Sequence, residues 1–533
     1  MKRRYINIFR LMGMMLAFSA LLSSCSEEFT QRDPEDSITA DNYYENNAQV
    51  MGATSGMYSR TWFQFSNKFF WAIAEVGSGN MYTGSGDVNA MRTFSMNGSD
   101  PELVNGWRSL WANVQQANFL INNLESRVSP SVDPAVTRNT IGEAYFFRAT
   151  AYFYLVRLWG AVPIIVNPLD HIDNPAIPTN RIEDIYTQIQ NDYLKAIEML
   201  NAKTRGTNYT DNGRVSQGSA KSMLAKVYLY NKNYAGAKQL AQEVITSNEF
   251  KLLGGAQLPA KSFGDLFTFP NNNNEESIFA IQWIADGNYG SANNCNTQFG
   301  ISTANLTTSN ASYGGVFGPS QDVLDLYEDN DLRKHETIMF PGHTYPDMKV
   351  LTNSGKDSQI GFTVPAADQI GGQGAGAAIK KYVLGIVNGN ATGPIDGWNM
   401  MENNTYIMRY AELLLIHAEA SLAGGTSTSD AAALDSFNAV RNRAGLSSVT
   451  TITFDDIFLE RRRELCFEGD FWFDLGRLPR AQAIAIMAAQ NRGSMNQEEH
   501  FTPSESDFYL DYPDNDVAKN PLLKQPPVPY QFN

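Results

Sequence analysis

A pair of helical segments between residues 220 and 244 sets the strongest limit on the fold. Apolar residues recur at helical spacing in both segments, and small residues alternate with aromatic ones. Asn231-Lys232-Asn233 separates the two segments as a turn. Small side chains let two helices approach closely, but one such pair cannot bury its apolar face alone. We therefore expect this pair to be one unit of a larger stack of helices.

A second pair of the same kind is predicted from Tyr406 to Ala423 and from Asp430 to Ala444. Both pairs resemble tetratricopeptide units. They lie far apart in the sequence, so we do not expect one uninterrupted array. The predicted fold is mostly α, with tetratricopeptide-like helical pairs that form a superhelical scaffold.

Other helices are indicated by their ends. Asp100-Pro101-Glu102 is typical of a helix start, because aspartate caps the free N–H groups and proline fits the first turn. Residues 141–159 are apolar almost all round, which predicts a buried helix. Asn180 and Glu183 have the spacing of a capping box, which predicts a further helix start.

Residues 252–404 differ in character, because Gly, Asn, Ser and Thr dominate them. Short strand-like runs such as 278–281 interrupt the loops. We expect a loop-rich region with short strands laid over the helical scaffold, and loops on a rigid frame commonly carry binding function. The predicted parts of the chain are a helical part at 25–251, a loop-rich ligand-binding part at 252–404 and a helical part at 405–533, after a signal peptide at 1–24.

The signal peptide is predicted from a basic start followed by a short apolar run at 11–22. This run is shorter than the roughly 20 residues that a spanning helix needs. It ends in Leu21-Leu22-Ser23-Ser24-Cys25, which resembles a bacterial lipobox. The resemblance implies that Cys25 is acylated and becomes the mature N-terminus; the alternative is ordinary cleavage beside an incidental cysteine. The acidic stretch that follows at once resembles the surface-export signal of Bacteroidetes lipoproteins.

The charge balance limits the kinds of molecule that the protein can bind. The chain has 41 basic and 56 acidic residues, and loss of the basic signal peptide would make it more acidic still. Nucleic-acid binding needs a basic surface against phosphate, so the balance argues against it. Cys295 and Cys466 are the cysteines besides Cys25, too few for a disulfide framework.

Motifs spread along nearly the whole chain resemble, in order, those of the SusD/RagB family. They are residues 33–44, Gly142 to Ala149, Leu158 to Pro163, Glu275 to Phe279, Ile407 to Glu412, Asn438 to Gly445, Glu460 to Leu465 and Phe467 to Leu475. Two departures stand out. Asp470 replaces a basic residue of the usual run, and residues 520–533 match the family's ending only loosely.

The resemblance implies a mostly helical protein with four tetratricopeptide-like pairs. It also implies a non-enzymatic lipoprotein, facing the exterior of the outer membrane, that works as a lid on a SusC-like TonB-dependent transporter. The lid would bind an oligosaccharide or related nutrient and deliver it to the barrel, without a cofactor. Three alternatives stay open: a peptide-binding member of the same family, a surface glycoside hydrolase, and a helical-repeat scaffold that binds only protein.

The glycosidase alternative would rest on four acids near the C-terminus: Glu460, Glu464, Glu468 and Asp474. Two such carboxylates could serve as acid and base. Arginines are interleaved with them, however, so we expect a structural ion-pair network. No histidine pair has the spacing of metal ligands, and no metal site is predicted. His417 lies on an apolar helical face and is expected to pack in the core.

Carbohydrate binding asks for flat aromatic rings beside amide and carboxylate groups. Three loop stretches supply this mixture. The candidate ligand-binding residues are Trp71, Asn80 and Tyr82 in the first, Trp283, Asn288, Tyr289 and Tyr313 in the second, and Trp398 in the third. Any single aromatic is more often core than platform. We nevertheless expect at least two of these rings to line one shared pocket.

Overall fold

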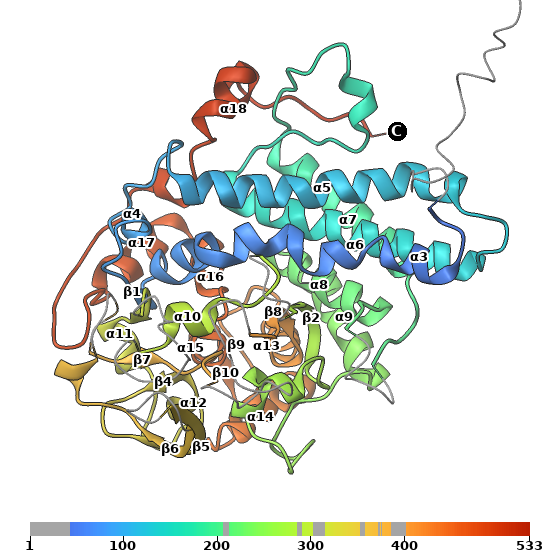
Figure 1. The fold of residues 1–533 in the computed structure, drawn as a ribbon. Helices are drawn as coiled ribbons and strands as arrows, with labels where there is room; N and C mark the ends of the chain where they lie inside the picture. Colours follow the sequence, from blue (N-terminus) through green and yellow to red (C-terminus); the bar gives the residue numbers. More distant parts are fainter. Residues whose placement is uncertain are drawn as a thin grey trace, which may run out of the picture.

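The computed structural model describes residues 43–205, 213–284, 290–301, 315–351, 358–370, 374, 376–384 and 401–532. Helices dominate these residues, and the strands are few and short, so the predicted mostly α fold is confirmed (Figure 1). The helices of the first half are α3 (Asn47–Gly52), α4 (Asn89–Arg92), α5 (Pro101–Arg127), α6 (Pro134–Trp159), α7 (Ile182–Met199), α8 (Gln217–Tyr230) and α9 (Tyr234–Ser247).

The local signals of the sequence place these helices. The Asp100 side chain accepts hydrogen bonds from the backbone N–H groups of Glu102 and Leu103, so α5 begins where the cap predicted it. Helix α6 ends at Gly160, whose φ of 71° lies in the region that glycine tolerates best. Helices α8 and α9 form the predicted hairpin and pack against each other.

Helices α5 to α9 form a continuous stack, in which α5 packs on α6, α6 on α7, α7 on α8, and α8 on α9 (Figure 1). The helices of the last part are α13 (Tyr410–Ala420), α14 (Ala431–Arg443), α15 (Phe454–Leu465), α16 (Phe471–Gly476), α17 (Arg480–Ala489) and α18 (Asp514–Lys519). Helix α13 packs against α9 and α8, and also against α14 and α15. The stack is therefore continuous in space, although residues 252–404 interrupt it along the chain.

One predicted helix start is wrong. Residues 406–409 belong to strand β8 (Thr405–Arg409), and the helix begins at Tyr410. Strand β8 pairs antiparallel with β2 (Ser277–Ile281), and both strands are buried throughout. Thr405, Tyr406 and Ile407 are residue types that favour a strand, and pairing with β2 overrides the helical spacing. The strand-like run predicted at 278–281 is confirmed as part of β2.

The predicted capping box at Asn180 and Glu183 is also wrong. Helix α7 begins after Arg181 without a side-chain cap. The Asn180 side chain instead accepts a hydrogen bond from the backbone N–H of Ile164 at 2.8 Å and donates one to the carbonyl of Val528 at 3.3 Å. Asn180 therefore joins the loop after α6 to the C-terminal segment.

The loop-rich region is tied to the scaffold by an aromatic cluster. The ring of Phe279 in β2 makes edge contacts with Phe146 and Phe147 of α6, at 5.1 and 5.7 Å between centroids. The other strand pairs among the described residues are all two-stranded and antiparallel: β1 (Met81–Tyr82) with β3 (Gly318–Pro319), β4 (Ile338–Met339) with β7 (Ala378–Ile379), β5 (Thr344–Leu351) with β6 (Ser358–Thr363), and β9 (Ser427–Thr428) with β10 (Ile452–Thr453).

Short helical turns complete the described chain. They are η1 (Ser55–Tyr58), η2 (Arg60–Trp62), η3 (Phe65–Phe69), η4 (Ala72–Val76), η5 (Pro168–His171), η6 (Gly264–Phe267), η7 (Phe269–Asn271), α10 (Cys295–Phe299), α11 (Gln321–Leu324), α12 (Lys334–Thr337), η8 (Ala367–Gln369), η9 (Glu505–Phe508) and η10 (Pro521–Lys524). Within the described ranges, no helix has both the length and the apolar character needed to cross a membrane.

Candidate ligand-binding site

An amide-rich run, Asn293 to Gln298, begins just before the short helix α10 and continues into it, and it packs against the π-helical turn η3. Asn294 and Gln298 lie one turn apart, and each donates a hydrogen bond to the Oδ1 atom of Asn67, at 3.0 and 2.8 Å. Asn67 is only partly buried, whereas Asn294 and Gln298 are buried. π-Helical turns are frequent at functional sites. The sequence prediction missed Asn67, Asn296 and Gln298.

Several polar atoms around α10 are buried without a hydrogen-bond partner. They are the Oδ1 atom of Asn294, the Nδ2 atom of Asn296, the Oε1 atom of Gln298 and the indole Nε1 of Trp71. A buried polar atom without a partner costs about 1–3 kcal/mol. The set contains both donors and acceptors, so it could pair with hydroxyl groups, which do both.

Trp71 and Trp283 both lie beside this amide run. The Trp71 ring makes an edge contact with Phe299, the last residue of α10, at 5.3 Å between centroids. The Trp283 indole donates to Thr405 Oγ1 at 3.0 Å, and the same hydroxyl accepts a hydrogen bond from Asn293. Both rings are buried, with exposures of 1% and 6%, so neither presents an open face to solvent in this structure.

Asn80 and Tyr82 lie in a different setting. The Asn80 side chain is buried, donates to Glu75 Oε2 at 2.9 Å and accepts from Arg462 Nε at 2.9 Å. Tyr82 belongs to β1 and is partly exposed, with the guanidinium of Arg92 5.1 Å from its ring centroid. Asn80 therefore links Glu75 to Arg462 in the core, whereas the Tyr82 ring is partly open to solvent and could contact a ligand.

The other candidate residues lie outside the described residues: Asn288, Tyr289, Tyr313 and Trp398, together with the lipobox and Cys25. The shared aromatic pocket thus stays a prediction.

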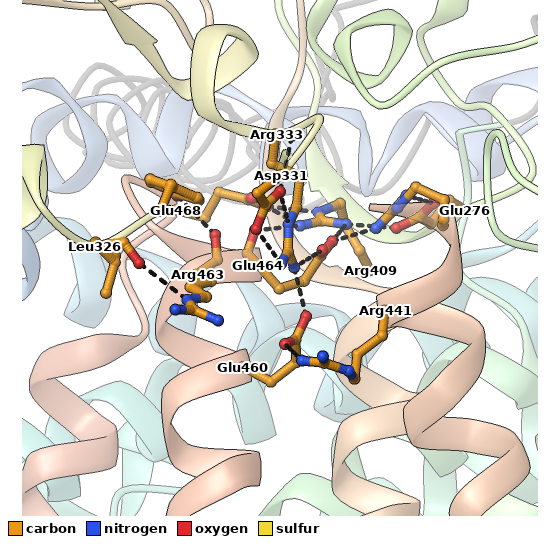
Figure 2. Close-up of polar contacts among 12 residues, drawn as sticks. Glu276, Leu326, Asp331, Arg333, Arg409, Arg441, Glu460, Arg463, Glu464 and Glu468 are labelled. Atoms are coloured by element: carbon orange, nitrogen blue, oxygen red, sulfur yellow. Dashed lines mark hydrogen bonds and ion pairs between the residues drawn. The ribbon is translucent and has the colours of Figure 1, made fainter. Parts of the chain in front are cut away.

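The acids considered for catalysis form the predicted ion-pair network. Figure 2 shows Glu464 between Arg333 and Arg409. Glu276 and Glu468 also pair with Arg409. Glu464 accepts hydrogen bonds from Arg333 and Arg409 at 3.0 Å each, and from Arg443. Their side chains are at most 1% exposed. All three of these arginines come from other segments of the chain rather than from the arginines interleaved with the acids.

The electrostatics of Glu464 follow from this setting. Burial alone would raise the pKa of its carboxyl, but Arg443, Arg409 and Arg333 outweigh burial and hold the pKa well below its ordinary value. Glu464 is therefore ionised and fully paired at neutral pH. A glycosidase needs two carboxylates that flank a sugar in an open cleft. These buried acids instead hold β8, α14 and α15 together.

Among the described residues, no group of three or more His, Cys, Asp or Glu side chains could hold a metal ion. His417 is 1% exposed and its Nδ1 lies 2.9 Å from Ser436 Oγ, so its predicted place in the core is confirmed.

The stacked helices, interrupted along the chain by a loop-rich insertion, define a helical-repeat scaffold. The model of the SusD family matches residues 275–529, and a second family model, described as "Starch-binding associating with outer membrane", matches residues 33–229. A SusD-like protein of Bacteroides ovatus is 31% identical over 98% of both chains. A SusD-like protein of Formosa agariphila is 24% identical over 88% of this chain and 91% of its own. The chain belongs to the SusD family, as its motifs predicted.

Solved structures share the fold along most of the chain. One is a crystal structure with xylogluco-oligosaccharide, 29% identical, with a TM-score of 0.79 over 91% of this chain and 99% of its own. Another is described as a laminarin-binding SusD-like protein, 26% identical, with a TM-score of 0.70 over 90% of this chain and 98% of its own.

Proposed function

We propose that this chain is a non-enzymatic lipoprotein of the outer-membrane surface that binds an oligosaccharide and delivers it to a SusC-like TonB-dependent transporter. The main support for glycan binding is the cluster of amide and indole groups around α10 that have no hydrogen-bond partner. A neutral sugar offers no charge, so its hydroxyls must pair with groups of this kind. The similar structures with xylogluco-oligosaccharide and with laminarin-binding activity in their descriptions support the same ligand class.

The aromatic residues complete the proposed site. Trp71 and Trp283 adjoin α10 but are buried, so they would stack on a ligand only if the loops around them opened. Tyr82, Tyr289, Tyr313 and Trp398 are the other proposed stacking rings, with Asn288 as a further amide. An aromatic platform adds binding energy at a small cost in entropy, because its ring has few rotamers to lose. Platforms on separate loops can follow the curve of an oligosaccharide.

Calorimetric titration with xylogluco-oligosaccharide and with laminarin tests the proposed site. Replacing Gln298 by Ala removes a donor to Asn67 and the free Oε1 atom, so it should weaken binding about tenfold. The matched control is Gln242→Ala, at an exposed position on α9. If Gln298→Ala and Gln242→Ala bind these glycans with equal affinity, the proposed site is wrong. Binding of short peptides but no glycan would favour the peptide-binding alternative, and release of cleaved sugar would favour an enzyme.

Delivery to the transporter is tested in cells. An affinity-tagged chain extracted from outer membranes should bring a TonB-dependent barrel with it. Recovery of the tagged chain alone, under conditions that keep other outer-membrane complexes intact, would argue against delivery to such a partner.

A further inference from the structure

A cavity of about 120 Å³ lies among α6, α7, α8, α16, α17 and η9, in the helical scaffold. Aromatic rings and three arginines, Arg157, Arg477 and Arg480, form its wall, and no aspartate or glutamate lines it. Arg477 is neutralised by Glu419 and Asp474 behind the wall. The described ion pairs include neither Arg157 nor Arg480.

The Arg157 guanidinium is held between two rings. Its central carbon lies 3.7 Å from the ring centroid of Phe153 and 4.0 Å from that of Phe473, and its Nε donates to the Phe153 carbonyl at 2.8 Å. These contacts hold the group in place. Its Nη1 atom is buried and has no hydrogen-bond partner.

Arg480, the first residue of α17, lies over a single ring. Its guanidinium carbon lies 3.7 Å from the ring centroid of Phe508, and its Nη1 is also buried without a partner. Burial lowers the pKa of Arg480, and the opposing effects of Tyr509 and Glu505 do not offset it. The hydroxyl of Tyr230 is a third buried donor on the same wall without a partner.

Two guanidinium groups and a hydroxyl on the wall of one small cavity each leave one buried donor atom without a partner, although both arginine side chains are partly exposed. A buried polar atom without a partner costs about 1–3 kcal/mol, and an oxyanion would satisfy all three donors. The planar fork of arginine matches carboxylate and sulfate oxygens, and aromatic stacking holds the fork in place before a ligand arrives. We propose that this cavity binds a small oxyanion group, a carboxylate or a sulfate, between Arg157, Arg480 and Tyr230.

This site is separate from α10, and it goes beyond the glycan-binding function. The cavity has room for a small anionic group. Two sources share this chemistry: a free oxyanion such as sulfate or acetate, and the carboxylate of an acidic sugar.

Calorimetry tests the proposal with sodium sulfate, sodium acetate and sodium galacturonate, with ionic strength kept constant by sodium chloride. We expect one saturable site per chain. Arg480→Gln should raise the dissociation constant about tenfold or more, because it removes a charge-assisted hydrogen bond. Tyr230→Phe should raise it about three- to tenfold and leave the melting temperature without anion unchanged or higher, because the hydroxyl has no partner to lose.

Arg108→Gln is the matched control, since Arg108 is exposed on α5 and its loss changes the net charge equally. Equal weakening by Arg108→Gln, no saturable binding of any of the three salts, or unchanged binding by both cavity variants would overturn the proposal. Tighter binding of galacturonate than of acetate would identify an acidic sugar as the source, and tighter binding of sulfate would identify a free oxyanion. If Arg480→Gln does not fold, Tyr230→Phe decides alone.

Discussion

Replacing Glu464 by Gln should lower the stability of the scaffold sharply. The substitution keeps the size of the side chain but removes the charge that faces Arg333, Arg409 and Arg443, all buried. Removing one partner from a buried ion pair typically costs about 3–5 kcal/mol, because the opposite charge stays buried without compensation. An unfolding entropy of about 2.1 cal/mol/K per residue gives about 1 kcal/mol/K for a chain of about 500 residues. The expected fall in melting temperature is therefore about 3–5 °C.

Scanning calorimetry measures this fall, and Glu328→Gln is the matched control. Glu328 pairs with Arg463 at 3.1 Å but is 52% exposed, and surface pairs contribute only about 0–1 kcal/mol. If Glu464→Gln lowers the melting temperature no more than Glu328→Gln does, the buried network does not hold the scaffold as argued. Ligand affinity should stay near normal in the folded variant.

The same carboxyl predicts a pH effect with a definite sign. The folded-state pKa of Glu464 is depressed below its ordinary value of 4.5. Its contribution is therefore complete above about pH 4.5 and is lost as the pH falls through the folded-state value. The difference in melting temperature between the wild type and Glu464→Gln should narrow below about pH 4.5. A constant difference from pH 7 to pH 3 would contradict this reasoning.

Three further outcomes are expected. Burial raises the pKa of Glu75 from its ordinary 4.5 to about 7, so ionisation of this carboxyl disfavours the folded state. Stability should therefore fall as the pH rises from about 4.5 to 7, and Glu75→Gln should flatten this slope in thermal melts, by up to about 3 kcal/mol. Gly469 has a φ of 87°, and a Cβ there would lie 2.0 Å from the Phe70 ring, so Gly469→Ala should cost roughly 3 kcal/mol or more and reduce the folded yield. Cys25→Ala should release the protein from the outer membrane in fractionation; a variant that stays firmly bound there would refute the anchor.

Local signals in the sequence predicted much of the helical fold. The Asp100 cap and the α8–α9 hairpin depend on residues within one or two turns of each other, so their physics is visible in a short window. Strand β8 could not be predicted this way, because its partner β2 lies more than 100 residues earlier. Asn180 bonds to Val528, which is 348 residues away in sequence, rather than to its own helix.

The candidate site was harder to predict, for the same reason. Asn67 meets Asn294 and Gln298 across 227 and 231 residues, and no short motif marks such an encounter. An amide-rich run such as 293–298 was the available signal. Composition drew attention to Trp71 and Trp283, but composition does not distinguish a ring packed against neighbouring side chains from one open to a ligand.

The stacking of α13 on α9 has a consequence for how the chain folds. During synthesis, the face of α9 that contacts α13 and the edge of β2 that pairs with β8 stay exposed while more than 100 further residues are made. Contacts so remote in sequence slow folding, and surfaces that stay exposed in the meantime are prone to aggregate. A truncated chain that stops before residue 405 would keep these surfaces permanently open. The two flanking helical parts should therefore fold cooperatively as one unit, and neither should survive proteolytic removal of the other.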